Sequence, residues 1–477
     1  MRKDNKERIK TKILISLIIL SVIQIGIHWN MQTQGLPFHF ISKIFGGNGR
    51  AANLDVDSLK NRYFTPDSIT VSISTSHWRL DERDSQFKKV WEDIRDNYIP
   101  SIIKKKPEKI LPKEQWAEIT SYRCVRIDFE ISWPSNIIHW LAQVKPGDTK
   151  AFEGIKSIVI APQLDVNETV NTIFIYDNNQ IYRYQVNIDD EFLAKRYYSN
   201  LADELTAKNK PILRLLSTVS NFTSEEDIYV ALTDGKGSAF SKISTGIPEQ
   251  IVLNRANMEN YNIQDNILLD QKESLSADYA DSSKYVMFTD TENLYRLYEN
   301  GILEYKYIPS TASNQDDISA AFKHAVTFIE QRRHLVGDAD IVLKSIDKEH
   351  SNIYRIEFEY KLEGVPVYYT ERQGAGISSP LIIKANSERI LECRWVIRYF
   401  NKFDKPMDYS VNFADLLNKQ IVSTYPEILE SRDKLFKRLE PGYIYNLSDL
   451  DSAFLLPNWI ISTNSKDYFI PLARKGG

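Results

Sequence analysis

Seventeen uncharged residues near the start of the chain, Ile13–Trp29, constrain its fold more than any other feature. Extending this run to residue 31 gives about 20 residues, the length of a helix that spans a bilayer. Residues 1–12 carry six basic and two acidic side chains. Because an excess of basic residues keeps a flanking segment in the cytoplasm, the rest of the chain is placed outside. We predict a cytoplasmic basic tail at 1–12, a single-pass transmembrane helix at 13–31 and a spacer at 32–54.

A cleaved signal peptide is the competing interpretation of the same run. The apolar core of a signal peptide is usually about 7–15 residues long and precedes a small-residue cleavage site. Here the run is longer, and the following residues 30–34 offer no Ala-x-Ala pattern. No Cys follows the run either, which argues against a lipoprotein anchor. The sequence therefore favours an uncleaved anchor in the cell membrane, with over 440 extracytoplasmic residues.

One face of the predicted transmembrane helix carries polar side chains. Leu17, Ser21, Gln24 and His28 follow one another at helical spacing, which places them on one face. Polar groups inside a membrane are unfavourable unless they meet a partner, so this face is a candidate contact with partner helices. Alternatively, Gln24 and His28 simply approach the outer headgroups. The cytoplasmic tail is too short to fold, so a signal to the cytoplasm would pass through another membrane protein.

The composition is that of a globular, mildly acidic extracytoplasmic part. Hydrophobic residues make up 42% and aromatic residues 12% of the 477 residues, which predicts two or three packed domains beyond the anchor. The formal charge is −4, and because the tail contributes +4, the remainder carries −8. This charge makes nucleic acids and polyanionic wall polymers poor candidates as ligands.

The two cysteines, Cys124 and Cys393, are too few for a disulfide scaffold in an exported protein of this size. Cys124 shares strand parity with the charged residues of its segment, which predicts a position on a polar face. Cys393 shares parity with Leu391, Trp395 and Ile397, which predicts burial. We therefore predict two free thiols.

Hydrophobic periodicity predicts an α+β fold for the extracytoplasmic part. Three domains are predicted: an N-terminal α+β domain at 55–208, a β-rich middle domain at 209–310 and a C-terminal α+β domain at 311–477. In the first domain, apolar residues at helical spacing predict a helix at 84–98 that ends at Pro100. The last domain is predicted to open with an amphipathic helix at 317–334, followed by a series of antiparallel strands.

Motif analysis indicates no catalytic, cofactor-binding or metal site. The seven histidines lack metal-ligand spacing, and no H-E-x-x-H, G-x-S-x-G or P-loop pattern occurs. His324 and His334 lie ten residues apart on one predicted helix, and Asp338 and Asp340 form a D-x-D of the kind common in turns. The fold could still assemble two carboxylates at the distance that a glycosidase needs. We predict that the protein is not an enzyme.

Three local features resemble a known family. They are Gly364-Val365-Pro366-Val367, the predicted hairpin at 381–399, and Leu456-Pro457-Asn458-Trp459 ahead of Tyr468-Phe469. Together with the basic tail, the anchor and the three outer domains, they make the chain similar to the YycH family of Gram-positive bacteria. The last domain also resembles YycI, the partner of that family. The resemblance implies an accessory regulator of a WalK-type sensor histidine kinase governing cell-wall metabolism, in a hetero-oligomer with a YycI-like protein.

Two functions from different classes are therefore open. The first is a non-catalytic regulator whose extracytoplasmic domains and anchor bind partner proteins. The second is a membrane-anchored cell-wall enzyme or wall-polymer-binding module, which would need a pocket with converging carboxylates. The sequence leaves open whether such a regulator activates or inhibits the kinase, and which outer surface binds the partner.

Overall fold

The computed structural model describes residues 55–477, except for gaps at 81, 83, 146–151, 163–169, 188–192, 194, 225, 234–238, 250, 253–284, 290–291, 299, 310–314, 371–378, 404–405, 422–424, 427, 429–434, 447–453, 465 and 476–477. The predicted tail, transmembrane helix and spacer at 1–54 lie outside the described residues. Within the described ranges, no helix has the length and apolar character needed to cross a membrane. Residues 55–248 and 282–477 form one compact unit.

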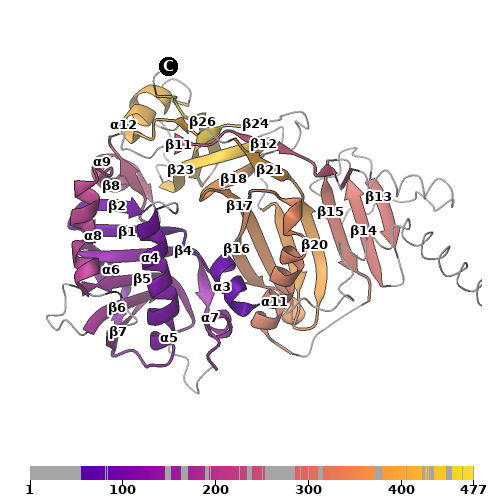
Figure 1. Ribbon diagram of the computed structural model, residues 1–477, viewed down its shortest axis with the longest axis horizontal. Helices are drawn as coiled ribbons and strands as arrows, with labels where there is room; N and C mark the ends of the chain where they lie inside the picture. Colours follow the sequence, from indigo (N-terminus) through magenta and orange to yellow (C-terminus); the bar gives the residue numbers. More distant parts are fainter. Residues whose placement is uncertain are drawn as a thin grey trace, which may run out of the picture. The chain divides into compact units, whose positions relative to one another are not determined.

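Nine strands of the described chain form the N-terminal sheet, in the order β10-β8-β2-β1-β4-β5-β6-β7-β3 (Figure 1). All neighbours in it are antiparallel. The strands are β1 Ser68–Ile73, β2 Ser76–Leu80, β3 Lys109–Pro112, β4 Cys124–Pro134, β5 Gly154–Ala161, β6 Val170–Asp177, β7 Gln180–Asn187, β8 Leu213–Leu215 and β10 Tyr229–Ala231. The alternating strands predicted in this part of the chain are therefore present.

Helices cover both faces of the N-terminal sheet. They are α3 Val56–Tyr63, α4 Ser85–Asp93, η1 Ile94–Tyr98, α5 Ile99–Ile102, η2 Lys113–Gln115, α6 Trp116–Ser121, α7 Ser135–Leu141 and α8 Lys195–Ala207, with α9 Leu216–Val219 following β8. On one face, Trp91 of α4 lies edge-on to Phe129 of β4, with ring centroids 5.6 Å apart. On the other face, Ile119 of α6 packs in a buried cluster with Cys124 and Val159.

The position of Cys124 corrects the prediction of a polar face. The alternation of β4 does place Cys124 on the same side as charged residues, but α6 covers that side at the start of the strand, and Cys124 is buried. Cys393 is buried as predicted. Both thiols are free, which confirms the prediction that they form no disulfide.

The helix that begins at Ser85 passes through Pro100, although the sequence predicted its end there. After α4 the chain makes the π-helical turn η1, in which the N–H of Ile99 donates to the carbonyl of Ile94. A new α-helical segment, α5, then starts at Ile99 and has Pro100 in its first turn. Proline is tolerated there because the first N–H groups of a helix have no intrahelical partner. The π turn thus allows a proline that would otherwise end the helix.

Among the described residues, twelve strands form the C-terminal sheet, along the path β13-β14-β15-β20-β19-β17-β18-β23-β25-β26 with β16 beside β17 and β9 beside β23. Only β18 and β9 are parallel to their neighbour β23 within this described set. The strands are β9 Thr223–Ser224, β13 Tyr285–Thr289, β14 Asn293–Tyr298, β15 Ile302–Tyr307, β16 Asp340–Lys348, β17 Tyr354–Leu362, β18 Val365–Thr370, β19 Leu381–Ala385, β20 Ile390–Val396, β23 Leu435–Asn446, β25 Pro457–Thr463 and β26 Asp467–Pro471.

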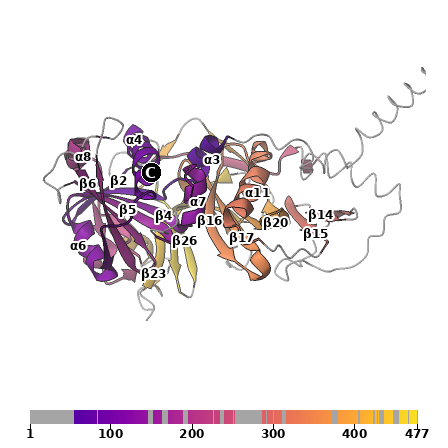
Figure 2. The ribbon, with the colours of Figure 1, turned by 90° about the horizontal axis from the view of Figure 1, so that it is seen from below.

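The amphipathic helix α11, Ile318–Glu330, covers the apolar face of the C-terminal sheet (Figures 1 and 2). Its first turn is capped by Asp317, whose Oδ1 accepts from the N–H groups of Ser319 and Ala320 at 2.9 and 3.1 Å. The buried residues of the helix are Ala321, Phe322, Ala325, Val326, Phe328 and Ile329. The predicted amphipathic helix is confirmed, and its predicted last residues belong to a separate turn, η5 Arg333–Leu335.

A smaller sheet of three described strands has the order β21-β12-β24. These strands are β12 Ile243–Gly246, β21 Tyr399–Lys402 and β24 Phe454–Leu455. The remaining short elements are the pair β11 Ala239–Phe240 and β22 Met407–Asp408, η6 His350–Asn352, α12 Phe413–Asp415 and η7 Leu416–Ile421. Because β12, β21 and β24 come from three distant parts of the sequence, this sheet joins the middle of the chain to its end.

The segment 209–310 contributes strands to several sheets. β8 and β10 extend the N-terminal sheet, β13, β14 and β15 extend the C-terminal sheet, and β12 lies in the three-stranded sheet. The fold is a mixed α+β, sheet-rich one, as predicted. The division into three domains with limits at 208 and 310 stays a prediction.

A charged junction as the candidate functional site

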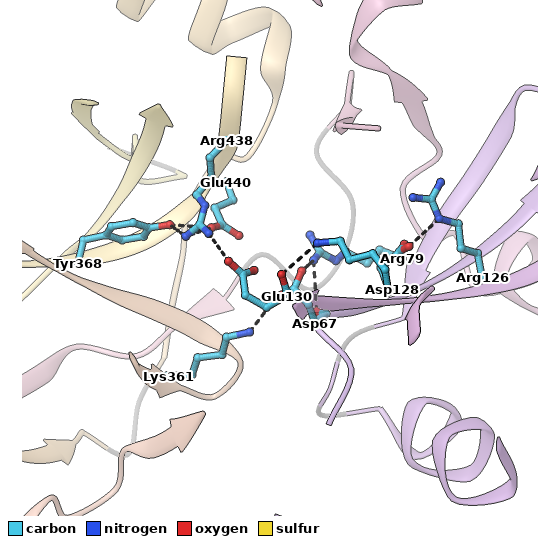
Figure 3. A network of polar contacts seen from close by, with 10 residues as sticks. Asp67, Arg79, Arg126, Asp128, Glu130, Lys361, Tyr368, Arg438 and Glu440 are labelled. Atoms are coloured by element: carbon cyan, nitrogen blue, oxygen red, sulfur yellow. Dashed lines mark hydrogen bonds and ion pairs between the residues drawn. The ribbon is translucent and has the colours of Figure 1, made fainter. Parts of the chain in front are cut away.

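Charged faces of two strands, one from each large sheet, meet inside the molecule (Figure 3). The charges alternate with apolar residues: Arg126, Asp128 and Glu130 on β4, and Glu357, Glu359 and Lys361 on β17. Such alternation usually marks a face in water. Here, however, Glu359 is 6% exposed and Lys361 is 8% exposed. We call this region, with Asp67, Tyr368, Arg438 and Glu440 beside it, the charged junction.

The first ion pair of the charged junction links the start of β1 to β17. Lys361 Nζ lies 2.9 Å from Asp67 Oδ1, and Arg79 Nη2 lies 3.5 Å from Asp67 Oδ2. The Asp67 side chain is 26% exposed and the Lys361 side chain 10%. Because these charges have left bulk water, each needs the other to offset the loss of hydration.

The second group is centred on Arg438 of β23. Its Nη2 lies 2.5 Å from Glu130 Oε1 and its Nη1 lies 3.4 Å from Glu440 Oε1. The Tyr368 hydroxyl donates to Glu440 Oε1 at 2.8 Å and accepts from Arg438. One guanidinium therefore connects β4 of the N-terminal sheet to two strands of the C-terminal sheet, a role suited to its several fixed N–H donors.

The electrostatics of the junction are set by burial and by these partners. Burial raises the pKa of Asp67, but Lys361 and Arg79 lower it more, so that the pKa lies well below its usual value. Burial lowers the pKa of Lys361, but Asp67 and Glu359 raise it more, so Lys361 stays charged. Burial raises the pKa of Glu359 to about 7, against the attraction of Lys361. Among the described residues, Glu359 forms no hydrogen bond or ion pair of its own.

An aromatic cluster adjoins the charged junction and joins the same two sheets. Phe322 of α11 lies edge-on to Tyr63, Trp133 and Trp140, with ring centroids 6.5, 5.8 and 6.1 Å apart. The Tyr63 hydroxyl donates to Glu330 Oε1 at 2.8 Å. Aromatic pairs of this geometry stabilise a fold beyond the area that they bury.

The junction is packed and holds almost no empty volume. The cavity between Asp67, Glu130, Trp133 and Lys361 measures about 10 Å³, room for about one water molecule. Within the described ranges, no three His, Cys, Asp or Glu side chains gather in a way that could hold a metal ion. The ion pairs of the junction connect the two large sheets.

The residues singled out in the sequence take separate places. Leu17, Ser21, Gln24 and His28 lie outside the described residues. Asp338 Oδ2 accepts from the Lys402 backbone N–H at 3.0 Å, and Asp340, the first residue of β16, pairs with Arg333 at 2.6 Å.

The residues of the charged junction were not found in the sequence because the partners are far apart along the chain. Asp67 and Lys361 are 294 residues apart, and Glu130 and Arg438 are 308 residues apart. The available signal was charge of both signs at alternate positions of an otherwise apolar strand. That signal marks a polar face and leaves open whether water or another polar face covers it.

Comparison with known proteins gives a match at the level of structure. No family model matches the sequence, and no curated protein matches it. The crystal structure of YycH from Bacillus subtilis matches with a TM-score of 0.52 and 13% identity, over 85% of this chain and 95% of that one. An uncharacterized protein from Eubacterium rectale ATCC 33656 matches with a TM-score of 0.28 and 8% identity, over 57% of this chain and 94% of that one.

The match to YycH extends over nearly all of that protein, and the likeness in sequence is low. It therefore concerns the arrangement of strands and helices, a sheet-rich α+β fold. The resemblance to YycH predicted from the sequence is confirmed at the level of the fold.

Proposed function

We propose that this chain is a non-catalytic, extracytoplasmic regulator of a WalK-type sensor histidine kinase that controls cell-wall metabolism. The observation that carries the proposal is the fold shared with YycH over 95% of that protein's length. YycH-like proteins act as accessory regulators of such kinases through protein contacts. Fold alone does not fix function, so the proposal also rests on the layout of the chain.

The layout of the chain supports a position in the cell membrane. A basic tail followed by an uncharged run at 13–29 suits a single-pass anchor with a cytoplasmic N-terminus. In our proposal, the anchor and the extracytoplasmic part form a hetero-oligomer with the kinase and with a YycI-like protein. The C-terminal sheet and α11 would be the YycI-like part of the chain.

The charged junction favours a regulatory function and disfavours a wall-hydrolysing enzyme. A glycosidase needs two carboxylates that face a substrate cleft at a set separation. Of the carboxylates that the fold brings together here, Asp67, Glu130 and Glu440 each pair with a basic side chain, and the cavity that Asp67 and Glu130 line measures only about 10 Å³. This arrangement suits an extracytoplasmic part that presents one fixed surface to a partner protein.

The proposal is tested by isolating the tagged full-length chain from membranes of its own bacterium. We expect it to copurify with the WalK-type kinase and the YycI-like protein. Deleting the gene should also change transcription from a promoter that the kinase controls. A chain that copurifies with neither protein, and whose deletion leaves that promoter unchanged, would contradict the proposed function.

The polar face of the anchor gives a specific prediction for Gln24→Leu. An interhelical hydrogen bond in a membrane contributes about 0.6–2 kcal/mol. We therefore expect this substitution to weaken association with the partner helices by roughly 3- to 30-fold and to alter kinase output. Crosslinking in membranes and a promoter reporter measure the two effects.

The matched controls are Ile18→Leu and Ile25→Leu, which lie on other faces of the anchor and nearly conserve its volume. Both should be close to neutral in the two assays. If Gln24→Leu behaves like these controls, then the polar face contacts lipid and carries no signal.

A further inference from the structure

One face of the three-stranded sheet β21-β12-β24 carries large exposed apolar side chains. Tyr399 is 45% exposed, Phe403 44%, Phe454 46% and Leu456 45%. These four are nearly half of the nine large apolar residues exposed in the described part of the chain. We call them, with Lys242, the aromatic face.

Strand alternation explains why these side chains share one side. Ile243, Phe400 and Leu455 point to the other side and are at most 1% exposed. Phe403 continues β21 beside β12, because its N–H donates to the carbonyl of Lys242 at 3.0 Å. The sheet therefore has one face in the core and one face in water, and on the face in water large apolar side chains lie beside the polar Ser244 and Asn401. A one-sided antiparallel sheet usually has polar residues there.

The aromatic face also carries a cation at its centre. Lys242 Nζ lies 3.7 Å from the ring centroid of Phe454 and 5.6 Å from that of Phe403. Among the described residues, no carboxylate lies within ion-pair distance of Lys242. The neighbouring Lys402, by contrast, pairs with Glu363 at 3.3 Å. The face thus offers aromatic area and one positive charge that has no acidic partner in the part of the chain that the structure describes.

Three classes of occupant differ in how well they fit this chemistry. An anionic membrane attracts surfaces with several basic residues, each contributing about 1 kcal/mol, whereas this face offers Lys242 alone among its described residues. A second copy packed about a twofold axis would bring the same patch, with its lysine and no described carboxylate, against itself. A protein segment with its own carboxylate supplies the missing charge and also buries the rings.

We propose that the aromatic face docks a segment of a partner's extracytoplasmic domain that presents a carboxylate between apolar side chains. The apolar side chains cover Phe403, Phe454 and Leu456, and the carboxylate pairs with Lys242 as water is excluded. Buried aromatic anchors surrounded by a polar rim are the usual centre of a protein interface. This inference rests on the proposed function and names the surface that performs it.

The test measures binding of the full-length chain, held in nanodiscs, to the purified extracytoplasmic domains of the WalK-type kinase and the YycI-like protein. We expect Phe454→Ser and Lys242→Glu each to weaken binding to one of these domains at least tenfold. Lys242→Met keeps the apolar part of the side chain and should weaken binding less than Lys242→Glu. Ile110→Ser is the matched control, since Ile110 is 55% exposed on β3 of the other sheet; it should bind like the unsubstituted chain.

The possible outcomes distinguish an error in the proposed docking surface from an error in the proposed function. If the unsubstituted chain binds and all four variants bind equally well, the aromatic face is not the docking surface, and the proposed function stands. If the unsubstituted chain binds neither domain, both proposals are overturned. If Phe454→Ser instead converts a dimer of this chain to a monomer, the face is a contact between copies, and the inference is wrong.

The membrane alternative needs its own measurement. In Phe454→Cys the new thiol is accessible because position 454 is exposed, and the labelling is specific because both native cysteines are buried. We expect an impermeant maleimide to label it equally in nanodiscs of zwitterionic lipid and of phosphatidylglycerol, and less once the partner domain is bound. Protection by phosphatidylglycerol alone would assign the face to the membrane and overturn the inference.

Discussion

Replacing Lys361 with Met is expected to lower the free energy of unfolding by about 3–5 kcal/mol, the range for removing one partner of a buried ion pair. The Lys361 side chain is 10% exposed and lies 2.9 Å from Asp67, and its charge also offsets that of Glu359. Methionine fills a similar volume, so the loss comes from the carboxylates that remain. The ion pair that Asp67 keeps among the described residues is the longer one with Arg79, whose side chain is 48% exposed. Urea unfolding at neutral pH measures the change.

The matched control is Lys348→Met on the neighbouring strand β16. Lys348 pairs with Asp316 at 2.6 Å, but the two side chains are 48% and 51% exposed. Surface pairs of this kind contribute about 0–1 kcal/mol. The double variant Lys361→Met/Asp67→Asn removes both charges and should recover part of the lost stability. Equal losses for Lys361→Met and Lys348→Met would show that burial of the pair has no effect on stability.

Replacing Glu359 with Gln is expected to stabilise the protein by about 3 kcal/mol at pH 8 and by much less near pH 4.5. Burial raises the pKa of Glu359 from 4.5 to about 7. Below pH 4.5 the carboxyl is protonated in both the native and the unfolded chain, and its contribution to the free energy of unfolding is fully present. As the pH rises through 7, the native chain must release a proton from a buried group, and the contribution is lost. Glutamine keeps the shape without the charge.

The measurement is the free energy of unfolding of both proteins at intervals from pH 4.5 to 8. Glu349→Gln is the matched control; Glu349 pairs with Lys384 at 3.0 Å and its side chain is 34% exposed. It should change the free energy of unfolding by only about 0–1 kcal/mol, the range for pairs near the surface. Asp67 titrates in another window, since its pKa is lowered: its contribution is present above pH 3.8 and is lost as the pH falls further. A constant difference between Glu359→Gln and the unsubstituted protein across this range would contradict the prediction.

Local features of the fold were predictable because they depend on neighbours in the sequence. The hairpin predicted at 381–399 contains the antiparallel pair β19 and β20, and the apolar stripe of the helix at 318–330 is buried as its spacing predicts. The π turn before Pro100 was not predictable, since it depends on how that helix packs. The burial of Cys124 likewise depends on tertiary packing, since its cluster includes Val159, Phe174 and Ile181 from later strands.

The charged junction and the aromatic face escaped prediction for opposite physical reasons. The alternating charges of β4 and β17 have the pattern of strands in water, yet partners about 300 residues away exclude water from them. Tyr399 and Phe403 have the pattern of core residues, yet in the described structure no element covers them. In both cases the residue types indicate which side of a strand is polar. Whether water or another part of the protein covers a given side of the strand depends on tertiary contacts, which the residue types do not indicate.

The separation of the ion-pair partners along the chain has a consequence for the order of folding. Synthesis proceeds from the N-terminus, so β4 is complete some 300 residues before Arg438 of β23 can reach Glu130. During that interval the side of the N-terminal sheet that will form the junction stays in water. An apolar side would be liable to aggregate over such a wait. A row of charges stays hydrated until its partners are synthesised. Burying these charges later has a desolvation cost, but on this side the incomplete chain exposes no apolar face through which it could aggregate.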